Sequence, residues 1–173
     1  MHDDLIRHFL KATSQNQDIY PLFLEHLDKL NNSFSVELRE FARQQFLKQP
    51  TKAVDLARII VKFSNLMQNF KQGNPTVNLE IAIAGYESAL TVITHETFPQ
   101  GWTSIQQTLI NAYQKRQNIL SQTVSELKEN GVQAQAQIND LIKQFQQEKQ
   151  QYCELKTQFL KSNGVSRIFC ISN

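Results

Sequence analysis

The sequence contains little of what interrupts helices, because its 173 residues include only 5 Gly and 4 Pro. Gly and Pro are the strongest markers of turns and helix ends. Leu, Gln, Lys, Glu and Ala, which favour helices, are frequent. This composition predicts long helices with short connections. The two cysteines, Cys153 and Cys170, show neither Cys-x-x-Cys nor Cys/His metal-binding spacing.

The chain also lacks a strong charge of either sign and any long apolar run. Its formal net charge of +2 is too small to imply binding to nucleic acid or to an anionic membrane surface. No stretch of about 18 apolar residues occurs, so we expect no transmembrane helix. The first residues, MHDDLIRHFL, are acidic and amphipathic, unlike a secretory signal. We therefore expect a soluble protein in the cytoplasm.

Motifs for chemistry are missing as well. The four histidines lack the i, i+3 or i, i+4 spacing that would clamp a metal from one helix. The sequence has no GxxxxGK[ST], GxGxxG or GxSxG. Cys153 and Cys170 lie in settings that are poor for activating a nucleophile. We expect a protein that is not an enzyme, without catalytic residues, a cofactor, a bound metal or a small-molecule substrate.

Apolar residues at helical spacing are what the sequence does contain. They predict consecutive antiparallel helices joined by short loops, as in a stack of helical hairpins. One predicted helix carries the apolar stripe Ile19, Tyr20, Phe23, Leu24, Leu27 and Leu30. Five other helices are predicted. The first covers 3–12, the second begins at Ser35 and is stopped by Gln49–Pro50, and the third begins at Thr51 and ends before the break at 72–75. The fourth covers 77–95, and the fifth begins at Pro99.

The segment 78–116 carries a more specific pattern, NLEIAIAGYESAL, then FPQGW, then LINAYQKR. It resembles the tetratricopeptide-like (TPR) repeats of cyanobacterial multirepeat proteins, although Ile110 stands where the repeat usually has Gly. The resemblance implies a protein-binding α-solenoid. Small and large apolar residues on facing helices would form its core, and we expect these repeat-core positions: Ala82, Tyr86, Ala89, Trp102, Leu109 and Tyr113.

From Leu120 to Phe159 the apolar residues follow a heptad pattern typical of a coiled coil. Gly131 and Glu148 are its two weak points. We favour a helix that continues through Gly131, and the alternative is a helix end at 129–131 with the next helix folded back. The expected seam residues are Leu120, Val124, Leu127, Ile138, Leu141, Phe145, Tyr152, Leu155 and Phe159.

The predicted fold is therefore all-α, a short TPR-like solenoid followed by a long coiled-coil helix or a helical hairpin. We divide the chain into a repeat domain at 1–116, a coiled-coil segment at 117–161 and a short tail at 162–173, which is expected to be disordered or the remnant of a longer chain. The expected function is a noncatalytic protein–protein interaction scaffold or adaptor. Its partner is a protein whose identity the sequence does not reveal, and a homodimer through 120–159 is a further expectation. The alternative is a regulatory or truncated module of a larger repeat-peptidase (CHAT-like) system, acting with a separately encoded catalytic partner.

Overall fold

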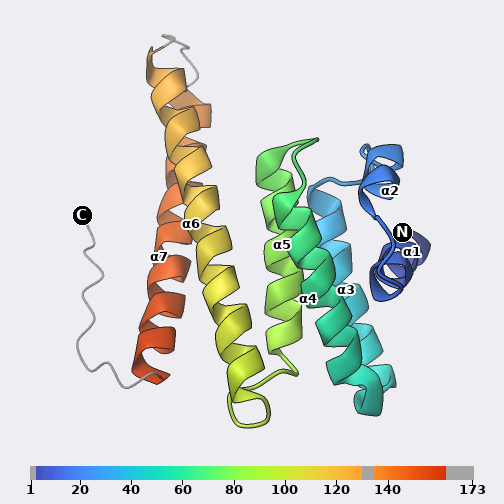
Figure 1. The fold of residues 1–173 in the computed structure, drawn as a ribbon. Helices are drawn as coiled ribbons and strands as arrows, with labels where there is room; N and C mark the ends of the chain where they lie inside the picture. Colours follow the sequence, from blue (N-terminus) through green and yellow to red (C-terminus); the bar gives the residue numbers. More distant parts are fainter. Residues whose placement is uncertain (1–2, 130–134, 163–173) are drawn as a thin grey trace. The chain divides into compact units, whose positions relative to one another are not determined.

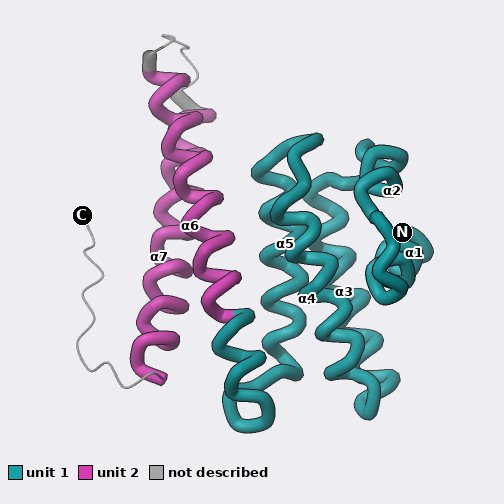
Figure 2. Tube along the Cα trace, viewed as in Figure 1, with its two compact units in different colours: residues 1–105 teal, residues 106–173 magenta. Residues whose placement is uncertain are grey.

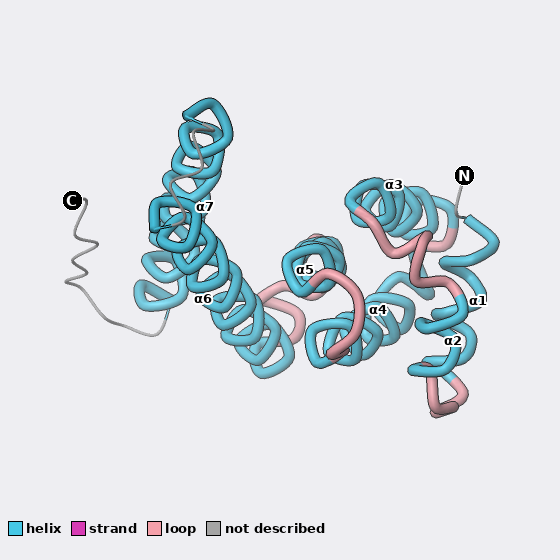
Figure 3. Tube along the Cα trace, turned by 90° about the horizontal axis from the view of Figure 1, so that it is seen from above, coloured by secondary structure: helices cyan, strands magenta, loops and turns pink. Residues whose placement is uncertain are grey.

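The computed structural model describes residues 3–129 and 135–162, and every regular element in these ranges is a helix (Figures 1 and 3). The predicted all-α class is confirmed, and the TPR-like solenoid stays a prediction. The elements are α1 (Asp3–Ser14), α2 (Tyr20–Glu25), α3 (Asn32–Lys48), the 3₁₀ turn η1 (Pro50–Lys52), α4 (Ala53–Asn69), α5 (Pro75–Leu90), α6 (Pro99–Glu129) and α7 (Gln135–Ser162).

The chain divides into two compact units, residues 1–105 and residues 106–173 (Figure 2). The division falls inside α6, whereas the predicted end of the repeat domain, at 116, lies further along the same helix. Most of the predicted tail at 162–173 lies outside the described residues.

Helix starts follow the capping chemistry that Asn provides. The side chain of Asn31 accepts a hydrogen bond from the Ser33 backbone N–H at 3.0 Å and so caps α3. Asn74 caps α5 by accepting from the N–H groups of Thr76 and Val77, and Pro75 occupies the first turn, where its missing N–H is not needed. The predicted breaks near these residues are therefore real helix boundaries.

Two predicted helices differ in extent from the observed ones. The stripe 19–30 contains only the six-residue helix α2, followed by a turn in which the N–H groups of Lys29 and Leu30 both bond to the carbonyl of His26. Part of the apolar stripe stays exposed, with Leu24 in α2 at 50% and Leu27 in the turn at 36%. The predicted helix 77–95 runs instead from Pro75 to Leu90. It ends early because the chain turns into a loop braced by side-chain hydrogen bonds between Thr94 and Thr97.

In the first unit, α5 packs against α3 and α4, and α1 packs against the same two helices. A cluster of fully buried Phe rings joins the first four helices, with Phe9 of α1 at its centre. The ring centroid of Phe9 lies 5.3 Å from that of Phe23, 5.8 Å from that of Phe34 and 5.9 Å from that of Phe63. Each such pair adds about 1 kcal/mol to the effect of burial alone. This cluster is the core that holds the amino-terminal helices together.

The helices α4 and α5 approach each other closely at Gly85. A Cβ atom built on Gly85 would lie only 2.0 Å from the Oγ atom of Ser64. Ser64 is itself held in place, since its hydroxyl donates to the carbonyl of Ile60 at 2.9 Å. Only a residue without a side chain fits at Gly85, which explains why glycine interrupts this otherwise apolar helix.

Candidate functional site

The predicted repeat-core residues do not form one open site. Ala82, Tyr86 and Ala89 lie on α5 and are fully buried, and the Tyr86 hydroxyl donates to the side chain of Asn65 at 2.7 Å. Burial raises the pKa of Tyr86 well above its usual value, so this hydroxyl stays protonated. These three residues belong to the core of the first unit, where they serve packing.

The remaining predicted repeat-core residues lie on α6. Leu109 and Tyr113 are buried and fall in the second unit, and Trp102 is half-buried in the first. The ring of Trp102 meets the edge of His95, with 5.1 Å between the centroids. His95 thus lies beside the first turn of α6 in the loop that follows α5.

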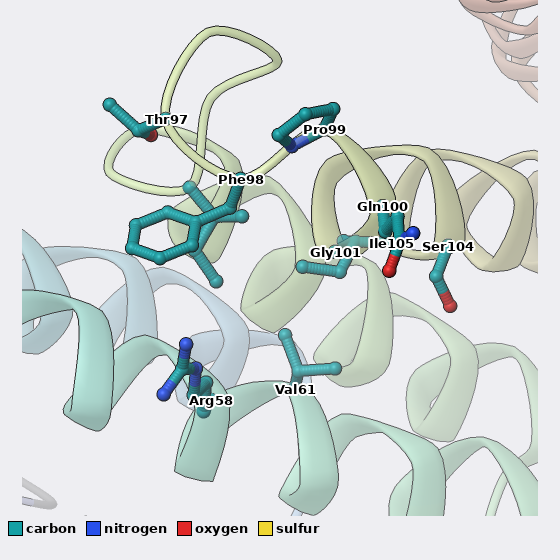
Figure 4. A pocket seen from close by; sticks show the side chains of 10 residues that line it. Arg58, Val61, Thr97, Phe98, Pro99, Gln100, Gly101, Ser104 and Ile105 are labelled. Atoms are coloured by element: carbon teal, nitrogen blue, oxygen red, sulfur yellow. The ribbon is translucent and has the colours of Figure 1, made fainter.

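A candidate site is an open pocket of about 570 Å³ in the first unit (Figure 4). It lies between α4, the loop after α5 and the first turns of α6. Its floor and walls are mostly apolar, and one side is open. The residues that line it are Arg58, Val61, Ile93, Thr97, Phe98, Pro99, Gln100, Gly101, Ser104 and Ile105.

Local structure explains how the pocket forms. The loop after α5 is braced by the Thr94 and Thr97 hydroxyl groups, 2.9 Å apart. Pro99 then starts α6, and the carbonyl of Phe98 accepts from the Trp102 N–H at 2.8 Å. Within this loop the side chain of Ile93 is buried, while that of Phe98 remains 37% exposed. The loop therefore presents an aromatic ring at the mouth of an apolar hollow.

A single charged side chain lines this pocket. The guanidinium carbon of Arg58 lies 5.4 Å from the centroid of the Phe98 ring, a cation–π arrangement. The nearest carboxylate partner is Asp55 on the same helix, with 3.6 Å between nitrogen and oxygen. This distance exceeds that of a good hydrogen bond, and both side chains are largely exposed, so the pair is weak.

The lining suits binding better than proton transfer. Thr97 and Ser104 supply hydroxyls and Gln100 supplies an amide, but no histidine, cysteine, lysine or carboxylate stands among the ten lining residues. General acid–base or nucleophilic catalysis needs such a group within hydrogen-bond reach of the reacting atom. What the pocket offers is apolar contact area, a few hydrogen-bonding groups and one cation.

Neither Arg58 nor Phe98 was identified as a site residue from the sequence. Phe98 belongs to the FPQGW motif, which served only as part of the resemblance to TPR-like repeats. Arg58 lies on the exposed side of α4, where nothing in the spacing shows that a loop beyond the next helix will reach it. The pairing of these two residues depends on how α4 and α5 pack, which periodicity does not reveal.

Two smaller hollows also lie on the first unit. One, of about 390 Å³, includes Arg7, whose guanidinium lies over the ring of Phe41. The other, of about 460 Å³, lies between α3 and α5 and is lined partly by charged residues. There Arg39 bridges Glu80 and Glu87 at 3.2 and 3.0 Å. Burial opposes the charge of Arg39, but the two carboxylates outweigh it and raise its pKa.

In the second unit, α6 and α7 lie side by side and run in opposite directions (Figures 1 and 3). The two helices are linked by an ion pair between Arg116 and Glu148, with 2.7 Å between Nε and Oε1. The interpretation that we favoured, one helix continuing through Gly131, is wrong. The described part of α6 ends at Glu129 and α7 begins at Gln135, and the Arg116–Glu148 contact is possible only if the two helices are antiparallel neighbours. Gly131 itself lies outside the described residues.

The predicted seam falls on the faces that carry this ion pair. On α6, Leu120, Val124 and Leu127 follow Arg116 at helical spacing, and Leu120 is buried. Glu148, a predicted weak point, is only 5% exposed and ion-paired. Leu120 apart, the predicted seam residues of the two helices are half-buried: Val124, Leu127, Ile138, Leu141, Phe145, Tyr152, Leu155 and Phe159.

Among the described residues, no three His, Cys, Asp or Glu side chains gather as a metal site. Within the same ranges no helix has the length and apolarity needed to cross a membrane. Comparison with known proteins found no match to a family model, a curated protein or a solved structure.

Proposed function

We propose that the protein is a noncatalytic interaction scaffold or adaptor, in which the first unit binds a segment of a partner protein and the α6–α7 hairpin serves assembly. The observation that carries this proposal is the open pocket of about 570 Å³ in the first unit. Aromatic residues and Arg are the side chains that protein interfaces favour, and Phe98 and Arg58 meet at its rim.

The resemblance of 78–116 to TPR-like repeats supports the same proposal. Repeats of that kind bind partner segments on the surface of stacked helices rather than through one reactive group. The described helices of the first unit are of suitable length, and α3, α4 and α5 pack as consecutive neighbours. We place the protein in the cytoplasm as part of this proposal.

The hairpin supports a role in assembly because two helices alone cannot cover the seam. Eight of its nine predicted residues are half-buried and one, Leu120, is buried. A third or fourth helix would remove the remaining apolar surface from water, as in a four-helix bundle. A second copy of the chain could supply these helices through its own hairpin. The expected homodimer would then be a bundle of two hairpins.

Two measurements test the two parts of the proposal. Random peptides displayed on phage and selected on the immobilised full chain should converge on related sequences whose binding Phe98→Ala weakens. A selection that yields no recurring sequence would contradict the binding role. Light scattering should give a dimer mass for the full chain and a monomer mass for a chain that ends at Arg116, and two monomer masses would contradict the assembly role.

A further inference from the structure

We infer that the pocket of the first unit selects peptide segments in which a large apolar side chain is followed by carboxylates. This inference rests on the proposed function, because it names the chemistry of the partner that the pocket would bind. It follows from three properties of the lining: its shape, its charge and the position of its only glycine.

The pocket has room for one large apolar side chain of a peptide and for the backbone on either side of it. Val61, Ile93 and Ile105 give the lining apolar side chains, and Phe98 adds an aromatic ring beside Arg58. A volume of about 570 Å³ is within the range of sites that enclose a ligand. Burying a Phe or Leu side chain here would remove its apolar surface from water and so favour binding.

The charge selects carboxylates next to that side chain. Arg58 is the one charged residue of the lining, and its side chain is 61% exposed, so its donors are open to a partner. Asp55 holds it only at 3.6 Å, and a peptide carboxylate could approach at hydrogen-bonding distance instead. The first turn of α6 also lines the pocket, and the positive end of this helix dipole acts in the same direction as Arg58. A lysine beside the anchor would meet two positive groups.

Substitutions at Gly101 can fill the pocket without unfolding the protein. A Cβ atom at this position would lie 3.8 Å from Ile93 Cγ2 and from Phe98 Cβ, which is ordinary contact with two lining residues. Alanine therefore fits in the first turn of α6, where it is also a better helix former than glycine. A leucine at 101 would extend further into the hollow and occupy the place of the anchor.

The test uses the full chain and three short fluorescein-labelled peptides that differ only at their centre. The centres are Phe-Asp-Asp, its amide twin Phe-Asn-Asn and the anchor-free Ala-Asp-Asp, and binding is followed by fluorescence anisotropy. We expect Phe-Asp-Asp to bind roughly fivefold tighter than Phe-Asn-Asn, as one exposed charge pair permits. Ala-Asp-Asp should bind more weakly than either.

Variants then locate the binding. Gly101→Leu should abolish it, Gly101→Ala should weaken it, and Arg58→Gln should remove the preference for Asp over Asn. Arg43→Gln is the matched control, because Arg43 forms the same i, i+3 pair with Glu40 outside this pocket and should leave binding unchanged. Thermal unfolding of each variant shows that the fold is intact.

Three results would overturn the inference: no binding of Phe-Asp-Asp, equal binding of the acidic and amide peptides, or binding that survives Gly101→Leu. The proposed function fails separately. If the phage selection converges on basic or uncharged sequences that need Phe98, the pocket binds peptides but not the acidic class named here.

Discussion

The side chains of Arg116 on α6 and Glu148 on α7 form an ion pair inside the helical hairpin, with 2.7 Å between Nε and Oε1. Arg116 is 19% exposed and Glu148 is 7% exposed, so both charges have lost most of their water. A charge in such a place is stable only with a partner of opposite sign. The ion pair thus makes each helix dependent on the other.

Glu148→Gln should lower the free energy of unfolding of the hairpin by about 3 kcal/mol, because it leaves the guanidinium of Arg116 without its carboxylate. Urea unfolding followed by circular dichroism measures the change. Glu154→Gln is the control, since it makes the same substitution at an exposed position of the same helix. The double variant Arg116→Leu with Glu148→Leu should recover the loss, and a double variant as unstable as the single one would contradict this explanation.

Gly85→Ala should destabilise the first unit by about 2 kcal/mol, although alanine is the better helix former. The new Cβ atom would lie 2.0 Å from Ser64 Oγ, and α4 and α5 must separate to admit it. The measurement is the midpoint of thermal unfolding. Gly101→Ala is the matched control, because its Cβ atom meets nothing closer than 3.8 Å and the substitution should be neutral or stabilising. Adding Ser64→Gly to Gly85→Ala should restore part of the loss.

Phe63→Ala should lower the free energy of unfolding by about 4 kcal/mol. The Phe63 ring is 1% exposed and contacts the rings of Phe9, Phe23 and Phe34 from three other helices, so its loss leaves a cavity that they cannot easily fill. The exposed Phe98 gives the comparison, since Phe98→Ala should cost less than about 1 kcal/mol. Similar costs for the two variants would show that the ring cluster is not the core of the unit.

The carboxyl group of Glu40 should titrate at a pH of about 2, because hydrogen bonds from Arg43 and Gln44 lower its pKa. Its ordinary pKa is 4.5. The stabilisation from a lowered pKa is therefore present above about 4.5 and is lost as the pH falls through about 2. Carbon-13 NMR of the labelled carboxyl measures the midpoint. Arg43→Gln should move it toward 4.5, and a midpoint near 4.5 in the unaltered protein would contradict the prediction.

The boundaries of the helices were predicted best where a single residue type determines them. Asn74 followed by Pro75 starts α5 through local chemistry, and α3 ends at the Gln49–Pro50 step. The stripe 19–30 misled the prediction because apolar spacing shows which residues can be buried, whereas the packing of neighbouring helices decides which are. Tertiary context overrides the local pattern there.

The candidate site could not have been predicted in the same way. Arg58 and Phe98 come from a helix and a loop that are separated by the whole of α5, and their contact depends on where that loop turns. The Arg116–Glu148 pair was missed for a related reason. The sequence shows Glu148 as a charged residue at a seam position. Its partner, Arg116, can be identified only once the chain is known to fold back on itself.

The ion pair between α6 and α7 also sets the register of the hairpin. Heptads are nearly interchangeable, so α7 could slide by one heptad and still place apolar residues against α6. After such a slide Arg116 would face the position of Leu141 or Leu155, and Glu148 would be buried without a counter-charge. The cost of separating these two buried charges distinguishes the observed alignment from its neighbours by about 3 kcal/mol. One polar pair in an apolar seam thereby gives the hairpin a single alignment.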